Sequence, residues 1–290
     1  MSNVDQWTEI IRPKNNLWAV NLKEIWRYHD LMSLLVKRDI ITQYKQTILG
    51  PLWYVVQPAI TVVMYMVVFG GIAGISTDGI PQPLFYLAGI CMWQYFSDCL
   101  TKTSNTFVSN AGIFGKVYFP RLVTPLSNVI SNLVRFGIQF GLFCIVYAAF
   151  YFSGMGCGTI NYYALLFPLL VVMMAGLSLG FGIILSSLTT KYRDLQILFT
   201  FIVQLWMYAT PVVYPLSQVR GKSLIGIDLA TAMSLNPVTP IVETFKYGFL
   251  GAGEFIGWAW LAYSFVFMLL LLALGIIIFN RVEKTFMDTV

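Results

Sequence analysis

Six apolar segments occupy most of the chain after residue 50. They are residues 51–74, 84–107, 122–152, 162–188, 195–210 and 255–279. A helix needs about 20 apolar residues to cross a bilayer. Hydrophobic residues make up 58% of the chain and charged residues only 11%, whereas soluble domains carry about 25% charged residues. The pattern predicts an all-α integral membrane protein with six transmembrane helices, of which the fifth is short.

The basic residues are distributed unevenly over the two sides that this topology creates. Fourteen Lys and Arg residues fall on the side that holds both termini, and three fall on the other side. Because cytoplasmic loops carry the excess of Lys and Arg, we expect both termini in the cytoplasm. The first 20 residues include Asp5, Glu9, Arg12 and Lys14 and have no apolar core of the signal-peptide kind.

Two regions are expected along the chain. Residues 1–49 are predicted to form a cytoplasmic lead-in and an amphipathic interface helix on the membrane surface, with a bend near His29 to Ser33. Residues 50–290 are predicted to form the six-span transmembrane domain. Pro51 suits the first turn of its first helix.

The external stretch 211–254 is interrupted by four prolines. Its apolar run 238–250 is too short to cross a bilayer and suits a re-entrant or interfacial helix. Glu243 and Lys246 are three residues apart, so they are able to pair on one helix face. Broken helices persist at membrane depth only where protein buries them or where they line a cavity. We therefore expect re-entrant helices before the last span, forming the external wall or lid of a pathway.

A glycine-containing, charged stretch, residues 110–121, separates the second and third apolar segments on the cytoplasmic side. We interpret it as the place where a partner protein acts on the membrane domain. Gly221-Lys222-Ser223 is not a nucleotide-binding P-loop, because Leu216 occupies the position of the first glycine. The sequence shows no metal motif and no nucleophile beside a base. We expect no catalytic residue, metal or cofactor on this chain, and ATP, if used, on another subunit.

Asp98 and Arg135 are a deep acid and base within the second and third apolar segments. Unpaired charges at such depth are costly, so the two side chains are expected to pair or to face water. Two interpretations stay open: a structural ion pair, or an Arg135 that lines a path for an anionic substrate. Glycine pairs at helical spacing are expected to allow close helix packing; they are Gly70 with Gly74, Gly137 with Gly141, and Gly176 with Gly180.

Several short motifs occur in order over residues 30–290. They are Lys37-Arg38-Asp39, Tyr44 to Trp53, Gln57-Pro58, Lys116 to Arg121, Lys191 to Asp194, Thr210 to Pro215, Asn236-Pro237 and Arg281 to Phe286. Together they resemble the ABC-2-type polysaccharide export permeases. The resemblance implies a homodimer in the bacterial inner membrane, paired with two copies of a cytoplasmic nucleotide-binding subunit that holds ATP and Mg. It also implies export of a lipid-linked glycan, such as O-antigen, capsule or teichoic acid on polyprenyl diphosphate.

The resemblance also suggests roles for particular residues. A coupling helix, about residues 103–114, is expected to lie in a cleft of the ATPase subunit. The expected contact residues are Phe107, Val108, Asn110, Ile113, Phe114, Lys116 and Arg121.

Three basic residues, Lys37, Arg38 and Lys45, suit a diphosphate head group at the cytoplasmic lipid surface, although ordinary positive-inside anchoring explains them equally well. Aromatic residues are candidates to line a channel for sugars, with the interfacial aromatic belt as the alternative. With Arg135, the candidates are Trp53, Tyr54, Trp93, Tyr95, Trp206 and Tyr208.

The sequence fits two other functions less well. An ion-coupled flippase working without an ATPase is expected to have several intramembrane carboxylates and an internal repeat, and the sequence offers one deep carboxylate and no convincing repeat. A membrane-bound transferase needs acidic or histidine residues clustered on one aqueous face, and the sequence has none. The net charge of +5 does not imply nucleic acid, because the basic residues follow the membrane sides.

Overall fold

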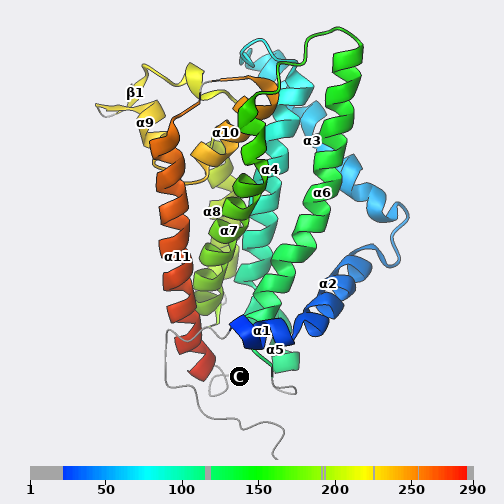
Figure 1. The fold of residues 1–290 in the computed structure, drawn as a ribbon, viewed down its shortest axis with the longest axis vertical. Helices are drawn as coiled ribbons and strands as arrows, with labels where there is room; N and C mark the ends of the chain where they lie inside the picture. Colours follow the sequence, from blue (N-terminus) through cyan, green and yellow to red (C-terminus); the bar gives the residue numbers. More distant parts are fainter. Residues whose placement is uncertain are drawn as a thin grey trace, which may run out of the picture.

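The computed structural model describes residues 22–114, 119–190, 192, 194–224, 226–253 and 255–285, which form a bundle of helices (Figure 1). Within these residues, strands are limited to β1 (Ser223–Leu224) and β2 (Ile227–Asp228), which pair antiparallel. The prediction of an all-helical membrane-type chain is confirmed apart from this two-residue ladder.

The N-terminal part consists of two helices rather than one bent helix. Helix α1 (Leu22–Arg27) and helix α2 (His29–Tyr44) are separated at Tyr28, one residue before the predicted bend. A 3₁₀ turn, η1 (Gly50–Leu52), then leads into α3 (Trp53–Tyr65), which continues as the π-helical segment η2 (Met66–Ile72).

The remaining elements follow the apolar segments closely. They are α4 (Gln82–Ser104), α5 (Thr106–Phe114), α6 (Val123–Phe152), η3 (Tyr162–Leu166), α7 (Phe167–Thr189), α8 (Leu195–Tyr208), η4 (Leu216–Gln218), α9 (Leu229–Ser234), α10 (Thr239–Leu250) and α11 (Trp258–Thr285). One boundary is corrected: Thr103 and Ser104 end α4, so the predicted coupling helix begins at Thr106.

Four helical stretches in the described residues have the length and apolar composition of a membrane span. They are Gly50–Ile72, Val123–Phe152, Tyr162–Thr189 and Trp258–Val282. Helix α4 is long enough at 23 residues, but it is less apolar and carries Asp98 and Lys102. Helix α8 is apolar but has only 14 residues. The sequence predicts six spans and four are found here; α4 and α8 account for the difference.

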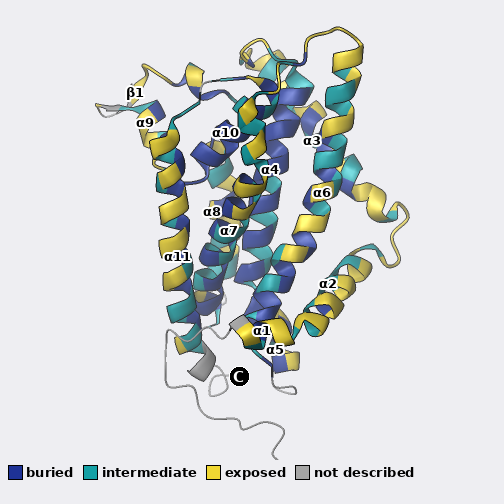
Figure 2. Cartoon of the chain, viewed as in Figure 1, coloured by how far each residue is buried: buried dark blue, intermediate teal, exposed yellow. Residues whose placement is uncertain are grey.

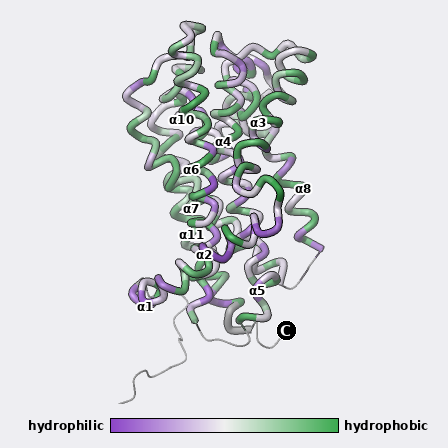
Figure 3. Tube along the Cα trace, turned by 90° about the vertical axis from the view of Figure 1, so that its right-hand side faces the viewer, coloured by the Kyte–Doolittle hydropathy of each residue, from purple (hydrophilic) through white to green (hydrophobic). Residues whose placement is uncertain are grey.

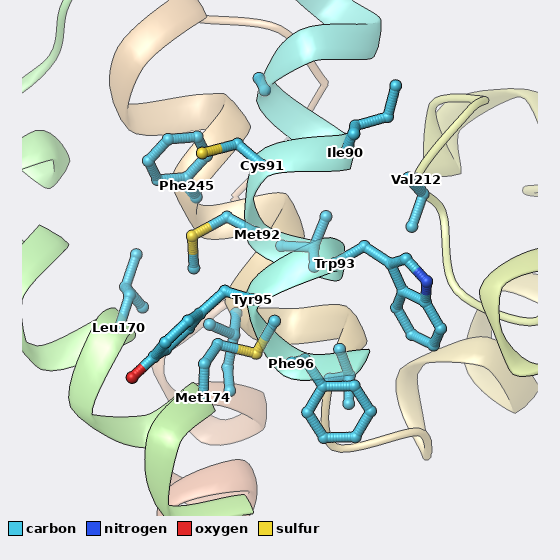
Figure 4. Close-up of a cluster of buried hydrophobic side chains, with 14 of the residues drawn as sticks. Ile90, Cys91, Met92, Trp93, Tyr95, Phe96, Leu170, Met174, Val212 and Phe245 are labelled. Atoms are coloured by element: carbon cyan, nitrogen blue, oxygen red, sulfur yellow. The ribbon is translucent and has the colours of Figure 1, made fainter. Parts of the chain in front are cut away.

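Helix α4 lies at the centre of the bundle and contacts α3, α6, α7 and α10 (Figure 2). Ten consecutive residues from Leu84 to Trp93 are buried. Trp93 and Tyr95 point to different sides of α4, Trp93 toward Val212 and Tyr95 toward Met174 (Figure 4). The outer faces of α6 and α11 are exposed in the isolated chain and carry apolar side chains, as membrane-facing helices do.

Close helix contacts depend on particular glycines. A Cβ on Gly89 would lie 2.3 Å from the carbonyl oxygen of Val212, and one on Gly180 would lie 2.9 Å from Leu271 of α11. A Cβ on Gly176 would meet Met268 of α11, so Gly176 and Gly180 both have the packing role predicted for this pair. Gly137 and its predicted partner on α6 instead have open space around them in this chain.

A buried ion pair anchors α10 inside the bundle. Lys246 Nζ lies 2.9 Å from Glu243 Oε1, and each residue is only 1% exposed. The ammonium group also donates a hydrogen bond to the carbonyl of Pro211 and lies 4.2 Å from the ring centroid of Phe85 on α4. The pair therefore ties α10 to α4 and to the segment that follows α8.

The two ends of the bundle differ in what they carry. Helices α1, α2 and α5 lie at one end together with the C-terminal part of α11, and α9, α10 and β1 lie toward the other (Figure 1).

Asp228 caps α9 by accepting the backbone N–H of Thr231 at 3.0 Å. This hydrogen bond holds the pKa of the Asp228 carboxyl below its ordinary value.

Replacing Gly89 with alanine is expected to lower the free energy of unfolding by about 1–3 kcal/mol, because the new methyl group meets a backbone carbonyl that cannot rotate away. The matched control is Gly137→Ala, which adds the same group in open space. It should leave the stability unchanged or raise it, since alanine favours a helix by about 0.5–1 kcal/mol over glycine. Equal losses for both variants in detergent unfolding would contradict the packing.

Replacing Lys246 with methionine is expected to cost about 3–5 kcal/mol, because Glu243 would keep a buried charge without its cation. The double variant Glu243→Gln, Lys246→Met removes both charges and should recover part of that loss. Unfolding of the two single variants and the double variant in detergent measures the coupling. Simple additivity would show that the pair is not coupled.

Candidate functional site

Helix α5 is held at the end of the bundle by α4 and α7. The chain turns at Asn105 between α4 and α5. Thr189 on α7 donates its hydroxyl to the carbonyl of Ser104 at 3.0 Å, and the Phe107 backbone N–H donates to Ser186 Oγ at 3.4 Å. These bonds fix the direction in which α5 leaves the membrane domain.

The two phenylalanines predicted to contact an ATPase face inward. Phe107 is 0% exposed and Phe114 is 3% exposed. Their rings lie 5.9 Å apart, and the Phe107 ring stacks on Phe279 of α11 at 4.8 Å. Both belong to one buried cluster together with Ile25, Leu35, Phe119, Val123 and Ile183. The prediction that Phe107 and Phe114 lie on the surface of α5 is therefore corrected. In this chain they anchor α5 to α11 and to the N-terminal helices.

The outer face of α5 carries other residues. Val108 is 39% exposed and Ile113 is 37% exposed. Ser109 and Gly112 are exposed between them, and sequence reasoning missed both. Residues 108, 109, 112 and 113 are three or four positions apart across one helix face, so this spacing could have identified Ser109 and Gly112 from the sequence.

The three other predicted contact residues are placed differently. Asn110 is 9% exposed and donates to the carbonyl of Thr106 at 3.0 Å. Arg121 is half-buried, with its guanidinium carbon 5.7 Å from the ring centroid of Phe114. Lys116 lies outside the described residues. Of the seven residues, Val108 and Ile113 are therefore the ones on the surface of α5.

The structure brings Asp98 and Arg135 together. Arg135 Nη1 lies 2.7 Å from Asp98 Oδ2, with side chains 12% and 26% exposed respectively. Arg135 Nη2 donates to Gln57 Oε1 at 3.3 Å, and the guanidinium carbon lies 4.9 Å from the ring centroid of Tyr54. The Tyr54 hydroxyl donates to Gln43 Oε1 at 3.1 Å. This polar network joins α4 and α6 to α3 and α2, and it confirms that the two charges pair, while a role of Arg135 in lining a path stays a prediction.

Most of the aromatic channel candidates form core contacts within the single chain. Trp93 is 6% exposed and Tyr95 is 2% exposed, so neither faces an open path here (Figure 4). Trp206 is half-buried, with Phe96 at 5.3 Å on one side and Phe181 at 5.2 Å on another. Trp53 and Tyr208 are exposed, at 45% and 52%. Of the six aromatic candidates, Trp53 and Tyr208 are therefore the ones exposed in the isolated chain.

The three basic candidates also differ. Lys37 is exposed and lines an open groove between α2 and α6 with a volume of about 390 Å³. Arg38 Nη2 lies 2.9 Å from Asp39 Oδ1, so its charge is already engaged. Lys45 is exposed just after the end of α2. Across the described residues, no three His, Cys, Asp or Glu side chains gather closely enough to hold a metal ion.

Comparison with known proteins supplies the family. Residues 30–250 match the family described as ABC-2 type transporter. The chain is 28% identical over 227 residues to the O-antigen export system permease protein RfbA of Myxococcus xanthus, covering 78% of this chain and 82% of that protein. It is 25% identical over 260 residues to the protein of the same name from Klebsiella pneumoniae, covering 89% and 94%.

A more distant relative is the polysialic acid transport protein KpsM of Escherichia coli, 20% identical over 263 residues, which cover 89% of this chain and 95% of that protein. The family match covers well over half of the chain and includes α5, the Asp98–Arg135 pair and the α2–α6 groove. The chain is a member of the ABC-2 type transporter family, a permease similar to the polysaccharide export permeases.

Proposed function

We propose that this chain is the transmembrane permease subunit of an ATP-driven exporter. It moves a lipid-linked polysaccharide, O-antigen-like and carried on polyprenyl diphosphate, from the cytoplasm across the bacterial inner membrane. The observation that carries the proposal is the match of residues 30–250 to the ABC-2 family, together with relatives named as O-antigen export permeases.

The proposed topology has six spans: α3 with η2, then α4, α6, α7, α8 and α11. Helix α4 has the length of a span, and its charged residues are tolerable because other helices surround it. Helix α10 is the re-entrant helix near the external end, with its buried ion pair shielded by protein. Both termini are cytoplasmic, as the asymmetry of Lys and Arg indicates.

The outer face of α5 is the proposed docking site for the separate ATPase subunit, which would supply ATP and Mg. Val108, Ser109, Gly112 and Ile113 form a small apolar and neutral surface on the end of the bundle where α1 and α2 also lie. Inward contacts of Phe107 and Phe114 attach α5 to α11, so a push on this face is transmitted into the membrane helices.

A second copy of the chain is proposed to cover the face formed by α3 and α8. The two helices lie on the same side of the bundle (Figure 3), and the Tyr65 hydroxyl contacts Met207 Sδ at 3.3 Å. Thr200 and Gln204 are exposed polar residues of α8. Polar side chains facing hydrocarbon are costly, so a protein partner or a water-filled path between the two copies suits them better than lipid.

The exposed aromatic candidates support the same arrangement. Trp53 is at the start of α3, and Tyr208 is at the end of α8. Between two copies they would border a path for sugars, with Lys45 at the cytoplasmic entrance for a diphosphate. The ion-coupled alternative is not favoured, because Asp98 is paired with Arg135 and the family match indicates an ATPase partner.

Replacing Ile113 with aspartate is expected to abolish export while leaving the chain folded, because it puts a charge on the exposed face of α5. Copurification of the ATPase subunit should be lost, and polyprenyl-linked glycan should accumulate at the cytoplasmic side. The measurement combines affinity purification with surface labelling of the glycan.

Leu188→Asp is the matched control for this variant, since Leu188 is 44% exposed in the last turn of α7 and lies outside the proposed path. Phe114→Asp is unsuitable for the same test, because a buried charge would unfold the cluster that holds α5. Normal export by Ile113→Asp would exclude the outer face of α5 as the docking site.

Cysteine placed at Phe201 on α8 is expected to give cross-linked dimers with a short thiol-reactive linker in native membranes, because this residue is 56% exposed on the proposed dimer face. Leu270→Cys on α11 is the control, with 60% exposure on another helix. Both are made in a Cys144→Ser background, since Cys144 is an exposed thiol. Dimer bands from Leu270→Cys alone would move the interface to α11.

A further inference from the structure

The groove between α2 and α6 is not used by the export path proposed above. Helix α2 diverges from α6 toward its C-terminal end, and much of its surface is exposed (Figures 1 and 2). The groove is lined by Met32, Ser33, Val36, Lys37, Ile40, Ile41 and Ile130. Its walls are therefore almost entirely aliphatic, with one hydroxyl and one ammonium group.

Helix α2 contacts α6 but buries little of its own surface. Leu35 is the single buried residue of this 16-residue helix. Leu34 and Ile41 are 62% and 50% exposed. An unfilled apolar groove beside such a helix loses the dispersion contacts that hold two surfaces together. An apolar ligand in the groove would add such contacts between α2 and α6.

Lys37 gives the groove its charge. Its side chain has no ion pair among the residues the structure describes, whereas the neighbouring Arg38 is bound to Asp39. A single ammonium group matches the single negative charge of a phosphodiester, and the hydroxyl of Ser33 offers a second hydrogen-bond donor. No aromatic residue lines the groove, so it has no stacking surface for a sugar.

We propose that this groove binds one anionic phospholipid of the cytoplasmic leaflet. A hydrocarbon chain lies along Val36, Ile40 and Ile130, and the phosphate lies against Lys37. Basic pockets beside transmembrane helices at the cytoplasmic side bind anionic lipid head groups in this way, and a volume of about 390 Å³ is in the range of pockets for small ligands. The bound lipid acts as a wedge that sets the angle of α2.

The proposal depends on the membrane location of the chain and not on which substrate is exported. The test uses the full chain, with its ATPase partner if the two copurify, in nanodiscs of equal phosphatidylglycerol and phosphatidylcholine. After transfer to detergent, native mass spectrometry counts the lipids retained per chain. One phosphatidylglycerol is expected to remain on the unaltered protein, with little phosphatidylcholine.

Lys37→Gln is expected to reduce the retained phosphatidylglycerol about fivefold, as loss of one basic contact with an anionic lipid should. Lys23→Gln is the matched control, because Lys23 is an exposed lysine on α1 outside the groove. It should retain the lipid. Ile130→Trp fills the groove from the α6 side and should displace the lipid without removing any charge.

Three results would overturn the proposal. Equal losses for Lys37→Gln and Lys23→Gln would show general surface attraction and no site. Full retention by Ile130→Trp, with an unchanged melting temperature, would place the lipid elsewhere. Replacement of the phosphatidylglycerol by an equal amount of added polyprenyl phosphate would assign the groove to the carrier lipid of the substrate.

Discussion

The enclosure of α4 by other helices is the constraint on which the rest of the structure depends. Because α3, α6, α7 and α10 surround it, α4 tolerates Asp98 and Lys102 in a setting where lipid contact would be costly. The enclosure requires close approach, which Gly89 allows at the Val212 carbonyl. The Asp98–Arg135 pair then ties α4 to α6. The direction of α5 follows from where α4 ends.

Each end of the bundle has its own anchor. At the end with α1 and α5, an aromatic cluster around Phe107, Phe114 and Phe279 joins elements that are far apart in the sequence. At the other end, Glu243 and Lys246 tie α10 to α4 and to the chain after α8. A close-packed interior transmits displacement rather than absorbing it. Helix α5 contacts α7 and α11 directly and is connected through α4 to the end that carries α10.

Sequence reasoning worked best where one local pattern decided the outcome. Apolar length predicted α3, α4, α6, α7, α8 and α11, and the i,i+3 spacing of Glu243 and Lys246 predicted that they are able to pair. It failed on the orientation of α5, where Phe107 and Phe114 were predicted to meet a partner and instead face their own chain. A phenylalanine is equally hydrophobic in a protein interface and in a core, so hydrophobicity alone does not distinguish the two locations.

The sequence alone therefore determined the class of the protein, the positions of its long apolar helices and its family, because apolar length and motif order are properties of the chain itself. Only the tertiary structure decided that α4 is central, that Arg135 meets Gln57 and Tyr54, and that Lys37 lines a groove with Ile130. These facts join residues far apart in the sequence. They depend on how helices pack against each other, and one helix's periodicity does not contain that information.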